Sequence, residues 1–429
     1  MAKKIVYVPL DERPCNFAFA PMISENNPDF TLVCPDKSIM GQKKLPADHE
    51  ALVRFLKAEC ADAYGLALSV DTLLYGGILP SRLHTFSEEE LTERLNLLKE
   101  LKSVNPALKI FAFGLIMRCP SYSSSDEEPD YYEYCGREIF LRGQASHKYS
   151  LGVIGKEEYE TSIAELDKKI GGNLEDFLNR RQRNLRMLFK TLQMVGKEID
   201  KFVVPQDDSS PYGYTAIDQQ KLHAFIQKEN LPAVDVYPGA DEVGMTMLSA
   251  FVNEMHGKAV TICPVYPHED CKKVIPLYED RAVERSIASQ IKSAGCRLTE
   301  NEEEADILLF CNLPVGKMQD AAQKGGEQYD KRNLPAFVEK MRVALEQGKS
   351  VAAADLAYCN GGDDEYVSLM EKAFGVFRLS GYAGWNTSSN SLGTVICQAV
   401  VHHYYGDTPA HRAFTAERIY EDVGLPALR

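Results

Sequence analysis

Short apolar runs alternate with amphipathic segments along most of the chain. The runs are rich in β-branched residues, and the segments between them repeat apolar positions at helical spacing, which is typical of βα units and a parallel sheet. We expect strands at residues 5–10, 31–34, 65–70, 109–117, 202–205, 233–237, 260–265, 307–311, 350–354 and 377–381. We expect helices at residues 47–60, 87–103, 174–199, 216–229, 281–294 and 334–346.

The predicted fold is α/β and parallel-stranded: a TIM-barrel-like (β/α) domain with additional C-terminal α/β elements. A chain of 429 residues exceeds the usual size of one domain. We expect a catalytic domain at residues 1–256 and a C-terminal portion at 257–429 that completes the site, with the boundary near 255–257. At a finer level, Ser87 followed by three glutamates predicts a capping box at a helix start.

The stretch at about 120–172 breaks the βα rhythm. Its beginning, residues 121–130, is rich in serine and acidic residues, and helical sequence follows Tyr131, Tyr132 and Tyr134. We interpret it as an insertion over the strand ends, where long segments form lids or binding elements, with a solvated surface excursion as the alternative.

Charge and cysteine content narrow the class of protein. A formal net charge of −14 disfavours a nucleic-acid partner, which needs clustered Lys and Arg. The 11 cysteines are scattered singly without a C-x-x-C pair, which is typical of reduced thiols. No apolar run is long enough for a membrane span or a signal peptide. We therefore expect a bacterial cytoplasmic protein without a nucleic-acid or membrane partner.

Polar residues follow strand after strand at the carboxyl end, the edge where parallel sheets and barrels bind ligands. One such aspartate commonly caps the next helix, but several acidic groups converging on one edge repel each other unless a ligand, cation or shared proton is present. The candidates are Asp11, Arg13, Asp71, Tyr75, Arg82, Arg118, Asp207, Asp208, Tyr212, Asp241, Glu242, Asp355, Trp385, Asn386 and Asn390.

The adjacent pair Asp207-Asp208 is the first catalytic candidate. Neighbouring carboxylates can differ in environment, so that one donates a proton while the other stays ionised and orients the substrate. Asp241-Glu242 is the second candidate, with a helix N-cap as the alternative interpretation. Tyr212 is expected to provide an aromatic wall beside the pair.

A late segment contains the only tryptophan, Trp385, with Asn386 and Asn390 among small residues. Such a segment makes a poor core but a good pocket, because an indole offers a stacking surface and amides both donate and accept hydrogen bonds. A Trp buried beside a helix cap is the alternative.

Common catalytic motifs are missing. The sequence has no G-x-G-x-x-G after a strand, no G-x-x-x-x-G-K-[ST], no H-E-x-x-H and no G-x-S-x-G, and its nine histidines show no ligand spacing. An oxygen-rich cation site at Asp11, Asp71 and Asp207 needs no histidine and stays open as an alternative.

Five strings together resemble a bacterial family labelled domain of unknown function 4127. They are PLDERP from Pro9, SVDTLLYGG from Ser69, PQDD from Pro205, GADE from Gly239 and AGWNT from Ala383. The resemblance covers nearly the whole chain and implies no activity. Separately, a strand ending in Asp-Asp beside an aromatic loop is similar to the acid and orienting pair of substrate-assisted β-N-acetylhexosaminidases on TIM barrels.

The first hypothesis is a hydrolase without a cofactor, a glycoside hydrolase acting on a small sugar or amino-sugar conjugate. Asp208 or Asp207 would be the general acid and the other would orient the substrate. Asp241 or Glu242, Asp71 and Asn386 would bind hydroxyl groups, and Trp385 or Tyr212 would stack on the sugar ring. The alternatives are a Mg²⁺- or Mn²⁺-assisted hydrolase, lyase or isomerase whose arginines grip an anion, and a non-catalytic small-molecule sensor. The expected partner is a small molecule, with a second copy of the chain left open.

Overall fold

The computed structural model describes residues 2–424, which belong to two compact units. The first unit comprises Met1–Phe17 and Leu32–Ala240, and the second comprises Ala18–Thr31 and Asp241–Arg429. The boundary expected near 255–257 coincides with the end of α11 (Val243–His256), which the structure assigns to the second unit because α11 packs on α16 (Ser388–Tyr405).

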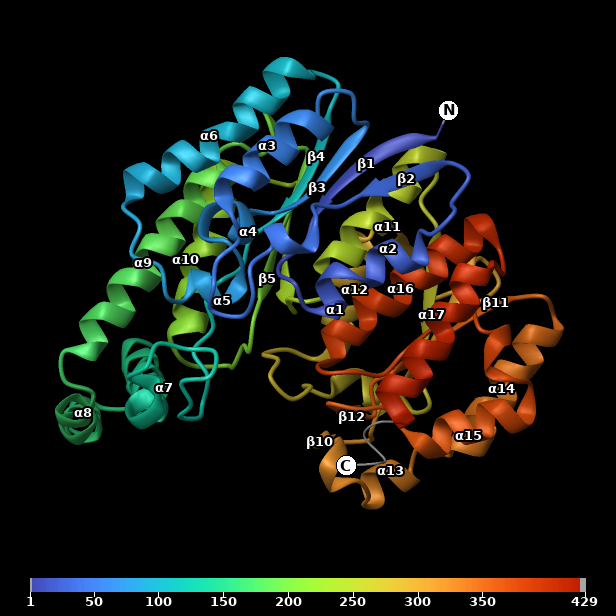
Figure 1. The fold of residues 1–429 in the computed structure, drawn as a ribbon. Coiled ribbons are helices and arrows are strands. Elements are labelled where there is room, and N and C mark those ends of the chain that lie inside the picture. The colour runs from blue at the N-terminus through green and yellow to red at the C-terminus, as the bar shows by residue number, and fades with distance from the viewer. Residues whose placement is uncertain (1, 425–429) are drawn as a thin grey trace. The chain divides into compact units, whose positions relative to one another are not determined.

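The first unit is built on a six-stranded sheet in the order β2-β1-β3-β4-β5-β6, in which β1 to β6 pair in parallel (Figure 1). Its strands are β1 (Lys3–Val8), β2 (Phe30–Val33), β3 (Gly65–Ser69), β4 (Lys109–Phe113), β5 (Lys201–Gln206) and β6 (Val234–Pro238). Its helices are α1 (Pro14–Phe17), α3 (His49–Glu59), α4 (Val70–Tyr75), α5 (Ile78–Ser81), α6 (Glu88–Val104), α7 (Tyr132–Ser150), α8 (Lys156–Ile170), α9 (Asn173–Leu192) and α10 (Tyr214–Glu229).

One face of this sheet forms a core with α3, α6 and α9. Alternate strand residues such as Val6, Leu66 and Ile110 share this face, because successive side chains of a strand point to opposite sides. Helix α6 begins as predicted: Ser87 Oγ accepts a hydrogen bond from the Glu90 N–H at 3.2 Å, and Glu90 Oε2 accepts one from the Ser87 N–H at 2.7 Å. The capping box is confirmed.

The insertion at about 120–172 is mostly helical. It contains α7 and α8, and buried residues of α7 such as Tyr132 and Ile139 form a small core of their own with Phe177 of α9 and Tyr214 of α10. Its first part, the acid-rich segment before α7, has no helix or strand and carries residues that matter for the site described below.

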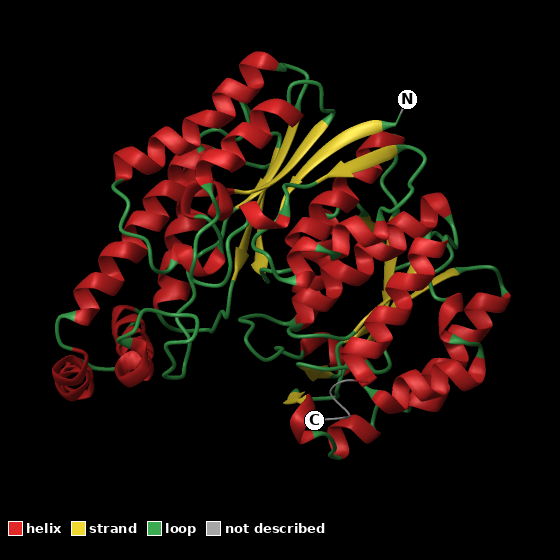
Figure 2. Ribbon diagram, viewed as in Figure 1, coloured by secondary structure: helices red, strands yellow, loops and turns green. Residues whose placement is uncertain are grey.

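The second unit contains a five-stranded parallel sheet in the order β13-β11-β9-β7-β8. Its strands are β7 (Thr261–Val265), β8 (Arg297–Leu298), β9 (Ile307–Asn312), β11 (Ser350–Asp355) and β13 (Gly381–Ala383), and a separate pair consists of β10 (Gln319–Asp320) and β12 (Tyr358–Cys359). Besides α11 and α16 it has α2 (Phe19–Ile23), α12 (Val283–Ser293), α13 (Glu327–Asp330), α14 (Leu334–Glu346), α15 (Asp364–Ala373) and α17 (Pro409–Ile419). Helices α14 and α15 cover one face, and α16 packs on β11 and β13 (Figure 2).

The parallel α/β prediction is confirmed, but the barrel is not. Apart from the β10–β12 pair, the described strands form two sheets, whose edges are β2 and β6 in one and β13 and β8 in the other, whereas closing a barrel would pair the edges of one sheet. The strand expected at 377–381 is also displaced: Val376–Arg378 is a 3-10 turn with Phe377 exposed, and β13 begins at Gly381. Within residues 2–424, no helix is long and apolar enough to cross a membrane.

Candidate functional site

The carboxyl edge of the first sheet carries most of the predicted site residues. Asp11 follows β1, Asp71 lies in the first turn of α4 directly after β3, Arg118 follows β4, and Asp207 and Asp208 follow β5. Because neighbouring parallel strands end at the same edge, five residues far apart in sequence lie along one border of one unit.

Five of the charged side chains in this region form what we call the carboxylate–arginine network. Arg82 Nη2 donates to Asp207 Oδ2 at 2.7 Å, and Arg118 Nη1 donates to Asp208 Oδ2 at 3.2 Å. Both guanidinium groups also donate to the same oxygen, Oε1 of Glu128, at 3.1 and 2.7 Å. Glu128 and Arg82 are almost completely buried. One glutamate therefore links the two arginines, each of which holds one member of the aspartate pair.

A cavity of about 430 Å³ borders the network. Glu127 connects the cavity to the network, because its Oε2 accepts a hydrogen bond from Arg118 Nη2 at 2.7 Å and its side chain lines the cavity. The remaining lining consists of Asp11, Glu12, Arg13, Lys43, Gly76, Gly77, Ile78, Leu79, Pro80 and Asp126. A cavity of this size, with charged groups at its wall, can accommodate a small polar molecule.

The two aspartates of the pair differ in environment. Burial first, and the negative charge of Asp207 second, raise the pKa of Asp208 to about 7, against the opposing effect of Arg118 and Arg82. Burial opposes ionisation of Glu127 too, but the neighbouring Arg118 and Arg82 lower its pKa overall. Asp208 also has a φ of 41°, a left-handed conformation that is uncommon outside glycine and that concentrates at functional sites. Asp208 can thus carry a proton near neutral pH beside ionised neighbours.

Asp71 and Asp11 lie on the same border with different partners. Asp71 Oδ2 accepts a hydrogen bond from the Leu115 N–H at 2.9 Å, and burial raises the pKa of Asp71 to about 7. Asp11 accepts hydrogen bonds from Arg13 Nε at 2.8 Å and from Asn16 Nδ2 at 2.9 Å. Ser69, not Asp71, caps α4 with its side chain, whereas Asp11 Oδ1 also accepts a hydrogen bond from the Arg13 N–H at 3.0 Å, as in an Asx-turn.

The raised pKa of Asp71 gives a prediction about stability. A carboxyl group that titrates near 7 when folded and near 3.8 when unfolded binds more protons in the folded state, so its contribution is complete below about pH 4 and is lost as the pH rises through 7. Asp71→Asn should therefore lose less stability than wild type between pH 5 and pH 8 in urea unfolding. The variant Asp126→Asn, at an exposed aspartate, serves as the control, and its unfolding free energy should change with pH as that of wild type does. If the unfolding free energies of all three proteins changed equally with pH, the raised pKa of Asp71 would be refuted.

Two of the predicted aromatic residues of the first unit lie elsewhere. Tyr75 is buried and stacks on His84 with ring centroids 4.6 Å apart, so it belongs to the core. Tyr212 packs edge-on against His147 at 5.8 Å, and the Lys148 ammonium lies 5.4 Å from its ring centroid. Neither ring lines the 430 Å³ cavity.

The other predicted site residues belong to the second unit. The Asp241 N–H donates to Asn390 Oδ1 at 3.2 Å, and Glu242 Oε1 accepts from Gln290 Nε2 at 3.1 Å. Glu242 occupies the N-cap position of α11, but its side chain makes no capping hydrogen bond. Of the predicted site residues Asp11, Asp71, Asp207 and Asp241, Asp11 lines the 430 Å³ cavity and the other three do not.

The Trp385 segment is held by its own unit. The Trp385 indole N–H donates to Thr394 Oγ1 at 3.2 Å, and its ring meets Phe19 edge to face at 5.6 Å. Asn386 has a φ of 48° and its carbonyl accepts a hydrogen bond from the Asn360 N–H at 2.8 Å. Thr387, not an asparagine, caps α16 through its side chain.

Glu127 and Glu128 were not singled out from the sequence. The sequence pointed to them only through the acid-rich segment 121–130, which was interpreted as part of a lid-like or solvated insertion. The spacing of residues does not reveal that two arginines from other elements contact this segment. Asp355, a candidate from the sequence, lies in a second buried cluster whose other members were not singled out: it accepts hydrogen bonds from Asn312 Nδ2 at 3.0 Å, Tyr382 OH at 3.0 Å and the Asp363 N–H at 2.7 Å. Burial and the charge of Asp363 raise the pKa of Asp355 to about 6.

Metal-ligating side chains are not grouped in the part of the chain that the structure describes: residues 2–424 contain no cluster of three or more His, Cys, Asp or Glu side chains arranged to hold an ion. Of the three carboxylates proposed for the metal alternative, Asp11 and Asp207 are ion-paired with arginines and Asp71 accepts a backbone N–H.

Comparisons with known proteins give a family but no activity. None of the curated proteins compared matches the chain. Among solved structures, a glycoside hydrolase family 138 enzyme targeting pectin rhamnogalacturonan II aligns with 9% identity over 95% of this chain and 39% of its own, with a TM-score of 0.21, which is too low to support an argument. The family model described as "Protein of unknown function (DUF4127)" matches residues 5–427, nearly the whole chain, and the chain therefore belongs to that family.

Proposed function

We propose that the protein is a carboxylate-based hydrolase that cleaves a glycosidic bond of a small sugar or amino-sugar conjugate, with Asp208 as the general acid. The observation that carries this proposal is the difference between the adjacent aspartates: burial and the charge of Asp207 raise the pKa of Asp208, while Asp207 is paired with Arg82. One protonated and one ionised carboxyl group are what acid-assisted departure of a poor leaving group requires.

In this mechanism the leaving-group oxygen receives the proton of Asp208 as its bond to the sugar breaks. The ionised Asp207 stabilises the positive charge that develops on the sugar ring, and the Asp208 carboxylate then accepts a proton from the incoming water. Arg118 remains bonded to Asp208 throughout, so the carboxyl group keeps its position while it changes charge. The cavity beside Glu127 would hold part of the sugar, and the scissile bond would extend to the aspartate pair, which does not itself line that cavity.

A panel of aryl glycosides with leaving groups of different acidity tests this proposal. A nitrophenolate departs with little help, whereas an unsubstituted phenolate needs a proton, so loss of a general acid must slow the phenyl substrate far more than the nitrophenyl one. We expect Asp208→Asn to show this divergence, and we expect the control Asp130→Asn, at an exposed aspartate that does not line the cavity, to behave as wild type. Equal slowing of both substrates in Asp208→Asn, or no hydrolysis of any glycoside by wild type, would reject the proposal.

Chelation separates the proposal from the metal-assisted alternative. Because Asp11 and Asp207 are occupied by arginines, the proposed mechanism assigns no step to a metal, and the rate should survive exhaustive treatment with EDTA. Loss of activity on chelation, restored by Mg²⁺ or Mn²⁺, would instead support the alternative in which the carboxylates hold a divalent ion.

A further inference from the structure

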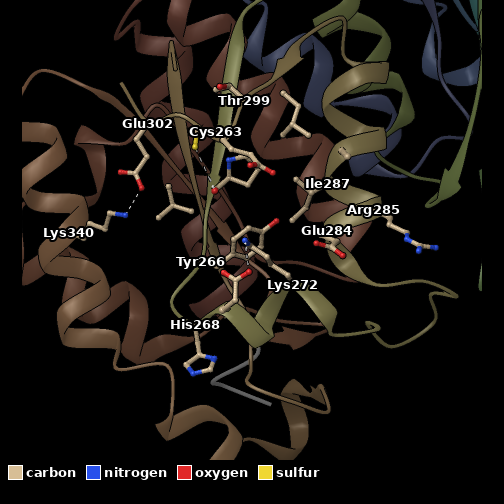
Figure 3. A pocket seen from close by; sticks show the side chains of 16 residues that line it. Cys263, Tyr266, His268, Lys272, Glu284, Arg285, Ile287, Thr299, Glu302 and Lys340 are labelled. Atoms are coloured by element: carbon tan, nitrogen blue, oxygen red, sulfur yellow. Dashed lines mark hydrogen bonds and ion pairs between the residues drawn. The ribbon is translucent and has the colours of Figure 1, made fainter. Parts of the chain in front are cut away.

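The second unit contains a cavity of its own, at the carboxyl end of β7. Its volume is about 600 Å³, within the range of small-molecule sites. Figure 3 shows Tyr266 and Lys272 in its middle, Glu284 and Arg285 of α12 on one side, and the Glu302–Lys340 pair on the other. All of its lining residues belong to the second unit, so it is distinct from the cavity beside Glu127.

The topology of this sheet favours a ligand site at that position. Taken in chain order, its five main strands occupy the sheet in the order 2-1-3-4-5: the chain starts at β7, moves outward to β8 and then returns to the other side of β7 at β9. Doubly wound parallel sheets bind ligands outside the carboxyl ends of the strands where the order reverses. β7 is the strand at which this sheet reverses.

The end of β8 leaves a backbone acceptor of β7, the Pro264 carbonyl, without a strand partner at the cavity; it accepts a long hydrogen bond from Cys263 Sγ at 3.9 Å. β8 has only two residues, and the last hydrogen bond on this side runs from the Thr299 N–H to the Ile262 carbonyl at 3.0 Å. Backbone groups of alternate residues point to the same side of a strand. In β7 the carbonyl of Pro264 therefore points to the same side as that of Ile262, but at a level where β8 has already ended. Proline has no N–H, and this stretch of the edge therefore offers an acceptor without the usual neighbouring donor.

Four glutamates and the Tyr266 ring line the cavity together with three cationic side chains, those of Lys272, Arg285 and Lys340, so that acidic groups outnumber basic ones. Lys272 already places its ammonium group 5.5 Å from the centroid of the Tyr266 ring and 2.8 Å from Glu269 Oε1. The hydrogen bond with Glu269 is the main cause of the raised pKa of Lys272, and the charges of Glu300 and Glu284 add to it. The protein's own ammonium group thus shows which charge this environment stabilises.

We propose that this cavity binds a small organic cation that carries a primary ammonium group on an apolar or ring-shaped body. The ammonium group would donate to the carboxylates of Glu284 and Glu300 and to the Pro264 carbonyl. The body would pack on the Tyr266 ring and on the neighbouring side chains of Ile287 and Leu298. Lys340 does not compete for the ligand's partners, because it is bonded to Glu302 at 2.6 Å.

The full chain can be tested with 2-phenylethylamine as the probe and 2-phenylethanol, its neutral counterpart, as the comparison. Calorimetry should show saturable binding of the amine at least about fivefold tighter than of the alcohol, because each carboxylate contact at a solvated rim contributes modestly. The double variant Glu284→Gln/Glu300→Gln should weaken amine binding by about fivefold or more.

The control is Glu339→Gln/Glu346→Gln, which makes the same change in net charge on the exposed part of α14, away from the cavity. It should bind the amine as wild type does. The proposal is overturned if amine and alcohol bind equally, if neither binds, or if both double variants weaken the amine to the same extent. Lys272→Met provides a second check: removing the resident ammonium group should strengthen binding of the amine, and weaker binding would contradict the assignment.

Discussion

Replacing Asp208 with asparagine should lower turnover by roughly 10²–10⁴-fold while leaving ligand affinity nearly unchanged. Asparagine keeps the shape of the side chain and a polar contact with Arg118, but it has no transferable proton. Because burial and Asp207 favour the neutral form of Asp208 in the folded protein, a neutral amide should be tolerated there, and the melting temperature should stay close to that of wild type. Turnover, ligand affinity and melting temperature measured on one preparation separate these effects.

Asp207→Asn is the matched comparison for this experiment. It removes the charge that faces Arg82 and leaves Asp208 in place, so the pKa of Asp208 should fall and the basic limb of the pH–rate profile should move to lower pH. Near-normal turnover in both variants would remove the pair from the mechanism and leave Asp241 and Glu242 as the next candidates.

The second large effect concerns stability. Arg82→Met should destabilise the protein by about 3–5 kcal/mol, because it removes one of the two guanidinium partners of the buried Glu128 and the guanidinium partner of the partly buried Asp207. The double variant Arg82→Met/Asp207→Asn removes one of these charges and should recover part of the loss. Urea unfolding at pH 7 measures both.

An exposed arginine supplies the control. Arg342 pairs with Glu339 and Glu346 on the surface of α14, where water screens the charges, so Arg342→Met should change stability little. If Arg82→Met proved no more destabilising than Arg342→Met, the carboxylate–arginine network would not be holding this edge of the sheet together, and its role in positioning Asp208 would fall as well.

The sequence predicted the strands better than their arrangement. Alternating apolar runs identify β1, β3, β5 and β9 and their parallel pairing, since a parallel sheet buries both of its faces. The order of strands is not encoded in that pattern, because it depends on which helix faces pack together. The helix at 243–256 illustrates this: its apolar sequence fits either unit, and only its packing on α16 assigns it to the second.

The candidate site was likewise predictable where it depends on local sequence and not where it depends on packing. Asp207 and Asp208 were found because adjacent carboxylates after a strand are visible in the sequence. Glu128 was not, because its role arises from two arginines that are distant in sequence and meet at one of its oxygens. Tyr75 was predicted to bind substrate because it is an aromatic residue near a strand end, but its ring stacks on His84 in the core. Residue type alone does not distinguish a tyrosine of the core from one that binds a ligand.

The protonation state of Asp208 tests the central claim most directly. Carbon-13 labelling of aspartate carboxyl groups allows their titration to be followed by NMR, and comparison with Asp208→Asn assigns the signal, which is needed because Asp71 and Asp422 also have pKa values raised to about 7 by burial. We predict that the signal missing in Asp208→Asn belongs to a carboxyl group that is still protonated at pH 6 and titrates near 7. A signal that titrates near 4 and is fully ionised at pH 6 would contradict the assignment of Asp208 as the general acid.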